Sequence, residues 1–442
     1  MMPRRLHGGA MQLSKFRSGV TRTTGPPRPF PGLHQLLIAQ SLSQGGFAVL
    51  NLAMPLLAAT VLRATPFQVS MVAASQTVAF LLIGLPVGVW VDRMRKRPIM
   101  IVADLARAAA LAAVPVLWAL DALTVAHLCG VAFVVGIATV FFDVADQSYL
   151  PHLVGTEGLV TANARLVAVD QTAAVAGPGI AGLIVQAVTA PLAVMVSAIA
   201  YVGSAFCVAR IKDRQPEAVD RTPRDRLGRS ILQGIRYLWG HPVLRRLVAC
   251  STTVTFCWSM GYGMLLVLLA RDLGVSAVTI GLLFTAGGAG GLCATAVVGR
   301  IVERFGDGRA VVVSVTLAAP CTLLAGLTGP GARLAFVVCA QFAFAAGLVI
   351  YNVAQVSYRQ RTVPGHLLGR VNATVRFFAW GARPLGMLLG GVFAEFHGAR
   401  SAVWVGAAGT ALASLWLLCS PLRGMRVLAQ PSSESSVTKE AL

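Results

Sequence analysis

Three carboxylates interrupt long apolar runs of this sequence, where an ionised side chain is costly. Asp143 and Asp146 lie one helical turn apart near the end of the apolar run 125–149, and Asp170 lies near the middle of the run 160–188. In lipid, a carboxylate at such depth costs at least about 2.5 kcal/mol unless it is paired, protonated or turned toward water. Each of the three is therefore a candidate for reversible proton binding.

Two arginines in a later apolar run are candidate partners for these acids. Arg376 and Arg383 are seven residues apart in the run 367–395, so a helix would place them on one face, two turns apart. A structural ion pair would explain the buried acids as well as proton binding does. The sequence leaves both explanations open.

The runs that hold these residues are long enough to cross a bilayer as helices. The chain is 56% hydrophobic and 12% charged, whereas a soluble globular domain is roughly 25% charged. About 20 consecutive apolar residues span the hydrocarbon core of a membrane. Such runs occur at 34–61, 68–91, 99–120, 125–149, 160–188, 191–210, 246–270, 277–301, 309–328, 333–358, 367–395 and 400–421. The sequence therefore predicts an all-α membrane protein with twelve transmembrane helices.

The positive charges predict how these helices are oriented. A net charge of +20 would suggest nucleic acid as a partner of a soluble protein, but here Lys and Arg concentrate in alternate gaps between the apolar runs. One set of gaps holds the loop 93–97 and the segment 210–246, and the other set holds only Arg63, Arg271, Arg333 and Arg400. Positive loops stay in the cytoplasm and contact anionic lipid. We therefore expect a multi-pass protein of the inner (plasma) membrane with both termini cytoplasmic, and no nucleic acid as a partner.

A long polar segment divides the chain into two sets of six helices. We expect a cytoplasmic N-terminal tail (1–33), a six-helix half (34–210), a cytoplasmic linker (211–245), a second six-helix half (246–421) and a C-terminal tail (422–442). Within the linker, apolar residues recur at helical spacing, which predicts a short amphipathic helix on the inner leaflet. They are Leu227, Ile231, Ile235, Leu238 and Trp239.

The two halves resemble each other in sequence. Ser148-Tyr149 reappears as Ser357-Tyr358, and Asn163-Ala164 reappears as Asn372-Ala373, in both cases 209 positions later. Six crossings return the chain to the same side, so the halves have the same orientation. They are predicted to be parallel repeats about an axis along the membrane normal, with a site between them.

This layout, together with the loop Gly88-Val-Trp-Val-Asp92-Arg93-Met-Arg95-Lys96-Arg97, resembles the major facilitator superfamily. The stretches 53–57 (AMPLL), 149–151 (YLP) and 234–238 (GIRYL) are similar to those of its macrolide-efflux and enterobactin-exporter branch. The resemblance implies the major facilitator fold and a secondary transporter that works by alternating access. It also implies export of a small amphipathic organic compound, such as an antibiotic or a siderophore, by proton antiport.

The resemblance implies roles for two groups of residues. The loop would hold one conformation shut through charges at helix ends, although a topological anchor of positive charge is the alternative. Its members are Gly88, Asp92, Arg93, Lys96 and Arg97, with Asp104 and Arg107 as further partners. Gly177, Pro178 and Gly182 are similar to a motif of the superfamily's antiporters. Ordinary close helix packing explains this second group equally well.

The resemblance also implies a central substrate cavity lined by the first, fourth, seventh and tenth helices. Aromatic rings with a few amide and hydroxyl groups suit a bulky amphipathic ligand. The candidates are Gln40, Gln44, Asn51, Gln147, Trp258, Ser259, Tyr262, Gln341, Phe344, Tyr351, Asn352 and Gln355, and the arginines Arg376 and Arg383.

Other functional classes find less support in the sequence. Proton-coupled uptake of a metabolite remains the alternative within transport, because the acids and the glycine motif do not fix a direction. A non-transporting membrane sensor or an intramembrane enzyme would need a catalytic cluster or signalling domain, and none is found in the sequence. With no nucleotide-binding motif, ATP is not expected as the energy source. We expect a proton gradient to supply the energy, and we expect no cofactor, no metal, no enzymatic activity and a monomeric protein.

Overall fold

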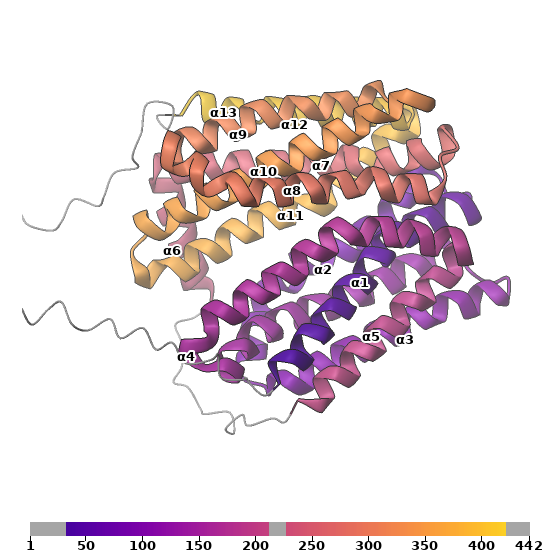
Figure 1. Ribbon diagram of the computed structural model, residues 1–442, viewed down its shortest axis with the longest axis horizontal. Coiled ribbons are helices and arrows are strands. Elements are labelled where there is room, and N and C mark those ends of the chain that lie inside the picture. The colour runs from indigo at the N-terminus through magenta and orange to yellow at the C-terminus, as the bar shows by residue number, and fades with distance from the viewer. Residues whose placement is uncertain (1–31, 212–226, 421–442) are drawn as a thin grey trace, which may run out of the picture.

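The computed structural model describes residues 32–211 and 227–420, and the described chain is entirely helical (Figure 1). The predicted tails, apart from Gly32 and Leu33, and the first part of the linker lie outside the described residues. Twelve helical stretches in the described part are long and apolar enough to cross a membrane. The predicted all-α architecture with twelve spans is therefore confirmed.

The helices follow the chain in two sets of six spans. The first set is α1 (Leu33–Leu56) continued by the π-helical turn η1 (Leu57–Val61), α2 (Pro66–Asp92), α3 (Lys96–Ala119), α4 (Val125–Val188) and α5 (Ala190–Arg210). The second set is α7 (Pro242–Val267) with the π-helical turn η2 (Leu268–Asp272), α8 (Ala277–Phe305), α9 (Asp307–Cys321) with η3 (Thr322–Leu327), η4 (Gly331–Leu334) with α10 (Ala335–Thr362), α11 (Gly365–His397), and α12 (Ala399–Leu412) with α13 (Leu415–Leu418). A further helix, α6 (Leu227–Gly240), precedes the second set.

Helix α4 contains two spans joined by a sharp bend. The spans are Val125–Gly155 and Thr161–Val188, and Gly155 between them has φ +66° and ψ 178°, which is not helical. A side chain at that φ would be strained, so glycine is suited to the reversal. The bend turns the chain back across the bundle without a long polar loop.

The two sets of helices repeat each other in local detail. Helices α1 and α7 both end in a π-helical turn, and 211 positions separate Leu57 from Leu268. The next helix in each set starts with a hydroxyl cap: Thr65 accepts a hydrogen bond from the Gln68 amide, and Ser276, 211 positions later, accepts one from the Thr279 amide. The sequence repeat is therefore also a structural repeat.

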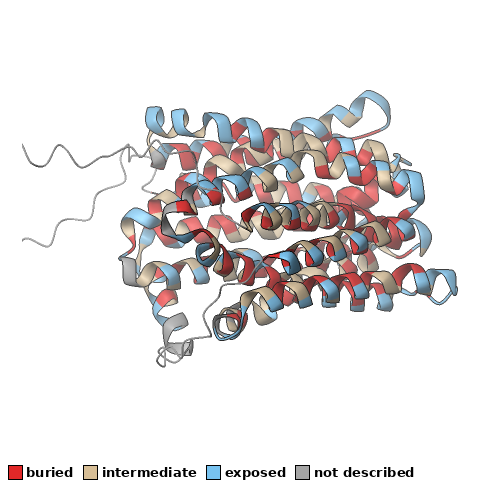
Figure 2. Cartoon of the chain, turned by 60° about the horizontal axis from the view of Figure 1, so that its bottom comes forward, coloured by how far each residue is buried: buried red, intermediate tan, exposed pale blue. Residues whose placement is uncertain are grey.

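The outer surface of the bundle is apolar. Val102, Ile199 and Leu317 are 65%, 64% and 69% exposed, and exposed residues cover the outer faces of the helices while buried ones fill the inside (Figure 2). Water would penalise such a surface, whereas lipid does not. The exposure pattern is that of a chain surrounded by hydrocarbon.

The apolar core is shared between the two halves on one side of the bundle only. We call the side where α1 begins and α5 ends the tail side; it lies at the left of Figure 1, near α6. We call the other the far side. One core cluster joins both halves on the far side and includes Leu57 and Leu268. On the tail side the core is split into one cluster for each half.

Close contacts between the halves are made through glycines on the α4–α8 and α2–α11 pairs. A Cβ atom added at Gly288 would lie 2.2 Å from the Ala174 carbonyl oxygen, and one at Gly281 would lie 2.3 Å from that of Pro178. Small residues allow two helices in a membrane to approach this closely. The halves are therefore held together by backbone-to-backbone packing that any side chain would disrupt.

Helix α6 packs against the second half of the protein on the tail side. Leu238 is fully buried, and the Tyr237 hydroxyl donates a hydrogen bond of 3.3 Å to the Thr362 carbonyl oxygen. Gly234 lies against α11, where an added Cβ would be 2.8 Å from the Arg370 carbonyl oxygen. Trp239 remains half exposed. Part of the apolar face of α6, which was predicted to lie on the inner leaflet, thus packs against the protein instead.

Replacing Gly288 with valine should drive the halves apart on the far side. Overpacking of this kind costs roughly 1–3 kcal/mol, and opening the interface relieves it. The Thr77 hydroxyl oxygen lies 3.9 Å from the Met387 sulfur across the α2–α11 pair. A thiol-crosslinking assay on Thr77→Cys/Met387→Cys protein, with the native cysteines replaced, should therefore give a lower yield when Gly288→Val is added. Gly299→Val on the same helix is the control, because nothing lies within 4 Å of a Cβ there; equal yields in the two variants would contradict the proposed role of the glycine.

Candidate functional site

A cavity of about 950 Å³ lies between the two halves. Its walls come from α1, α2 and α4 of the first half and from α7, α8 and α11 of the second. The volume is at the upper end of the range for small-molecule sites. Its charged lining residues are Asp143, Asp170 and Arg383.

Asp170 is held in this cavity by two amides from α1. The Gln40 and Gln44 side-chain nitrogens donate to the same carboxylate oxygen, at 3.3 and 3.0 Å. The two glutamines are four residues apart, so the helical repeat places both side chains on one face. The Gln40 amide oxygen is buried and has no hydrogen-bond partner.

Asp143 and Asp146 lie on the same helix as Asp170 but in different surroundings. Asp143 is exposed and lines the cavity, whereas Asp146 is buried and one of its oxygens has no partner. Asp143 is close enough to Asp170 and to Arg376 for electrostatic interaction. The three acids therefore form one electrostatically connected group.

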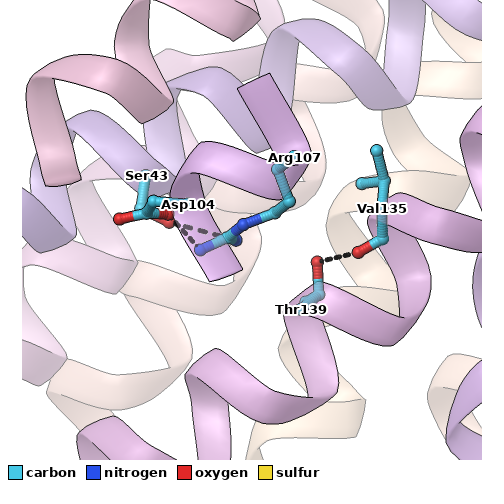
Figure 3. A network of polar contacts seen from close by, with 5 residues as sticks. All are labelled: Ser43, Asp104, Arg107, Val135 and Thr139. Carbon is cyan, nitrogen blue, oxygen red and sulfur yellow. Dashed lines mark hydrogen bonds and ion pairs between the residues drawn. The ribbon is translucent and has the colours of Figure 1, made fainter. Parts of the chain in front are cut away.

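An ion pair fills the middle of the first half, where Asp104 and Arg107 on α3 are both almost completely buried (Figure 3). Arg107 also donates to the Ser43 hydroxyl at 3.5 Å. Its guanidinium carbon lies 4.5 Å from the Phe142 ring centre and 4.3 Å from that of Tyr201. The cation is thus held between two aromatic faces from different helices.

Aromatic rings form the wall between the cavity and the second half. The Trp258 ring stacks on Phe344 with 4.0 Å between centroids and lies 5.4 Å from Tyr262. Trp380, also on the side of the second half, brings its ring to 5.4 Å from that of Phe80 in the first half. A planar apolar ligand would find several ring faces around the cavity.

A second cavity, of about 380 Å³, lies inside the second half. It is bounded by α7, α9, α10 and α11. Trp258, Trp380 and Arg383 line both cavities. The two spaces therefore share one wall.

Comparison with known proteins places this arrangement in a family. The sequence profile of the Major Facilitator Superfamily matches residues 36–383 and again residues 264–440. The chain belongs to the Major Facilitator Superfamily. It is therefore a membrane transporter of small molecules and not an enzyme.

Curated relatives of this transporter include efflux proteins. The multidrug efflux pump Tap of Mycolicibacterium fortuitum is 31% identical over 343 residues, which cover 74% of this chain and 81% of Tap. Tap of Mycobacterium tuberculosis (strain ATCC 25618 / H37Rv) is 30% identical over 346 residues, which cover 75% of this chain and 80% of that protein. The chain is thus distantly related to Tap.

Solved structures of the same fold cover nearly all of the bundle. The crystal structure of the nucleoside transporter NupG superimposes with a TM-score of 0.71 at 11% identity, covering 88% of this chain and 98% of NupG. A bacterial homologue of the iron transporter ferroportin in its inward-facing state gives 0.69 at 16% identity, covering 88% and 98%. At these identities the match confirms the major facilitator fold.

The predicted gating loop of the transporter lies on the tail side between α2 and α3. Arg97 donates to the Val208 carbonyl oxygen at 3.2 Å and to that of Ala209, at the end of α5 in the same half. Lys96 donates to the Met94 carbonyl oxygen, and Arg93 is exposed. A Cβ at Gly88 would meet nothing within 4 Å.

Other predicted partners of this loop lie elsewhere. The side chain of Asp92 lies outside the described part of the chain. Asp104 and Arg107 pair with each other inside the first half rather than at the helix ends.

The predicted antiporter motif lies where α4 contacts its neighbours. A Cβ at Gly177 would lie 2.7 Å from Ala48 on α1, and one at Gly182 would lie 2.5 Å from the Ala277 carbonyl oxygen on α8. Pro178 lines the central cavity. The motif therefore contributes both to packing between the halves and to the cavity wall.

The structure distributes the predicted substrate residues between the two cavities. Gln44, Asn51 and Tyr262 line the central cavity. Ser259, Phe344, Tyr351, Asn352, Gln355 and Arg376 line the second cavity, and Trp258 and Arg383 line both. Gln40 reaches the site through Asp170, whereas Gln147 and Gln341 line neither cavity.

Sequence reasoning missed the lining residues Arg359, Trp380 and Phe80, and helical spacing could have revealed the first two. Arg359 lies four and seven residues after Gln355 and Asn352, on the same face of α10. Trp380 lies between Arg376 and Arg383 on one face of α11. Phe80 carries no such signal, because its partner Trp380 is 300 positions away.

Replacing Arg107 with glutamine should destabilise the transporter strongly. Removing one partner of a buried ion pair leaves an uncompensated charge and costs about 3–5 kcal/mol. The double variant Asp104→Asn/Arg107→Gln should recover part of the loss, because neither charge remains. Thermal unfolding of the purified protein in detergent measures both variants, and a double variant less stable than Arg107→Gln alone would contradict the pairing.

Proposed function

We propose that this transporter exports a small amphipathic organic compound in exchange for protons, by alternating access across the plasma membrane. The observation that carries the proposal is the setting of Asp170 in the central cavity. Within the described residues it makes hydrogen bonds with two amides and no ion pair with a cation. A carboxylate in this setting, in a cavity between the two halves of a membrane protein, is a candidate proton-coupling group.

The surroundings of Asp170 suit both protonation states. When ionised, its oxygen accepts hydrogen bonds from the Gln40 and Gln44 amides. When protonated, it could donate to the Gln40 amide oxygen, which is buried without a partner. Protonation of Asp170 would thus give the Gln40 oxygen the hydrogen-bond partner that it lacks when Asp170 is ionised.

The direction of transport is supported by three observations. The apolar core between the halves is split on the tail side, and the arginine-rich gaps favour a cytoplasmic location for that side. An exporter must load its substrate from there. Both cited Tap relatives are named multidrug efflux pumps, and the antiporter-like residues Gly177 and Gly182 lie at helix contacts around the cavity.

The size and lining of the cavity support the substrate class. A space of about 950 Å³ with several aromatic rings and few charges fits a bulky, partly apolar compound. Antibiotics and siderophores are compounds of this kind. The finer resemblance to the macrolide-efflux and enterobactin-exporter branch stays a prediction, as does a monomeric state.

Efflux from preloaded cells tests the proposal. Cells that make the protein should lose one or more compounds of an antibiotic and siderophore panel faster than control cells, and a protonophore should abolish the difference. Asp170→Asn should reduce export to near the background level, because an amide cannot exchange a proton at this position. The Asp143→Asn variant is measured in the same assay, and the comparison shows which of the two acids couples export to protons.

Asp121→Asn is the matched control for these variants. Asp121 is exposed, lies between α3 and α4, and has φ 52°, a conformation that asparagine tolerates as well as aspartate. Export should be unchanged in this variant. Accumulation of a compound in place of its loss would overturn export and favour proton-coupled uptake.

A further inference from the structure

The two halves can be compared position by position, because the repeat has a fixed register. Helices α3 and α9 begin at Lys96 and Asp307, 211 positions apart. Around the fourth and tenth spans the offset is 209, as Tyr149 and Tyr358 show. Each residue of the first half near the Arg107 ion pair therefore has an equivalent in the second half.

The second cavity occupies the place that the ion pair fills in the first half. The equivalents of Asp104 and Arg107 are Val315 and Ala318, and both line the second cavity. The equivalent of Phe142, whose ring covers the Arg107 guanidinium, is Tyr351, another lining residue. The second half thus has an open space where the first half has a buried salt bridge.

The acids of the first half have neutral equivalents around this space. None of the residues lining the second cavity is a carboxylate. The pairs are Asp143 with Asn352, Asp146 with Gln355 and Asp170 with Ala379, and all three second-half members line the cavity. The second half therefore carries no negative charge at these positions.

Positive charge instead surrounds the second cavity. Arg359, Arg376 and Arg383 line it, and their equivalents in the first half are Leu150, Val167 and Ala174. Arg359 lies near the tail-side end of α10, and Arg376 and Arg383 lie two turns apart on α11. Together they line the space from the tail side inward.

Among the described residues these arginines have no carboxylate partner, whereas other polar groups of the cavity bond to one another. The Ser251 and Tyr351 hydroxyl oxygens are 2.8 Å apart, and the Gln355 amide donates to the Asn352 side-chain oxygen at 2.8 Å. By contrast, the Arg359 Nε is buried without a hydrogen-bond partner. Over residues 32–211 and 227–420, none of the three arginines forms an ion pair with a carboxylate.

Charge balance with the acids across the central cavity explains only part of this arrangement. Arg376 is close enough to Asp143 for electrostatic interaction. Arg383 lies over the Trp380 ring, with 5.6 Å from its guanidinium carbon to the centroid, and the group near Arg359 is the Tyr351 hydroxyl. Two of the three arginines therefore have aromatic neighbours and no acid.

We propose that the second cavity binds an anionic group of the transported compound, a carboxylate or a phosphate, and that this group supplies the counter-charge that Asp104 supplies in the first half. Guanidinium groups suit both anions, because they donate paired hydrogen bonds in one plane. The apolar body of the compound would lie along the Trp258 and Trp380 wall that the two cavities share. The transport of such a compound rests on the function proposed above, but its binding does not.

A pair of dyes that differ in one carboxylate tests the proposal by binding alone. Rhodamine 110 has a free carboxylate, and rhodamine 123 is its methyl ester. Fluorescence anisotropy with the full-length protein in neutral-lipid nanodiscs should show that rhodamine 110 binds roughly tenfold more tightly or better, as expected for one charge-assisted hydrogen-bonded contact. Arg359→Gln and Arg376→Gln should each reduce that preference, and Arg376→Lys should retain part of it.

Arg361→Gln is the matched control. Arg361 is exposed on the same helix two residues from Arg359 and donates to the Ser357 carbonyl oxygen rather than lining the cavity. It should leave the preference unchanged. Equal binding of the two dyes, or a preference that survives both Arg359→Gln and Arg376→Gln, would overturn the proposal.

Two further measurements separate this proposal from binding of a lipid headgroup and from the proposed export. If phosphatidylglycerol in the nanodisc removes the preference, a lipid headgroup occupies the cavity and the proposal is overturned. If the preference depends on the arginines while cells show no protonophore-sensitive export, the anion site stands and the proposed export falls. If both dyes are exported and the arginine variants change neither, the proposed export stands and the anion site falls.

Discussion

The structure depends on one constraint: the halves can approach on the far side only where no side chain intervenes. Gly281 and Gly288 on α8 meet the carbonyl groups of α4 directly, and around them a single apolar core spans both halves. Dispersion and close packing, rather than the hydrophobic effect, drive helix association in lipid. That packing is confined to one side, and residues of the shared core, among them Leu52 and Met264, line the central cavity.

Few polar contacts cross this interface in the described part of the chain, and none of them is an ion pair. The Phe67 amide donates to Glu395, the Val278 amide donates to Gln186, and Arg271 donates to the Ala64 carbonyl oxygen. Each of them joins a side chain to the backbone near the far-side rim. Separation of the halves would expose these groups to water and would leave no charge buried in the apolar interface. Such an interface can open without the penalty that breaking a buried ion pair incurs.

Much of the fold could be predicted from the sequence, because it depends on local pattern. Apolar runs and charged gaps locate the spans, and the constant offset between Tyr149 and Tyr358 predicts the repeat. The bend at Gly155 is harder to predict, since the helix continues through the predicted gap with one residue at positive φ. The packing of α6 on α11 also depends on a distant partner, because Gly234 lies against Arg370, more than 100 positions along the chain.

The candidate site could be predicted where its neighbouring residues lie on one helix. It was harder to predict where those residues come from several helices. Gln40 and Gln44 are adjacent on α1, but their common partner Asp170 lies 130 and 126 positions along the chain. The rings that hold Arg107 come from α4 and α5, and no spacing rule connects them with α3. A sequence pattern identifies which residues are costly to bury, whereas the identity of the group that compensates them is a property of the assembled bundle.

The two halves use one backbone repeat for different electrostatic tasks. In the first half, Arg107 fills the interior and its charge is matched by Asp104. In the second half, small residues leave the equivalent space open and arginines surround it. The first half would then bind protons and hold its own counter-ion. The second half would bind the ligand and hold no counter-ion of its own. Under the functions proposed above, the anionic substrate completes the charge balance of the second half, and its release restores the imbalance. Occupancy of the second cavity would then change the field at Asp143 through Arg376, which gives proton and substrate a direct electrostatic path across the shared wall.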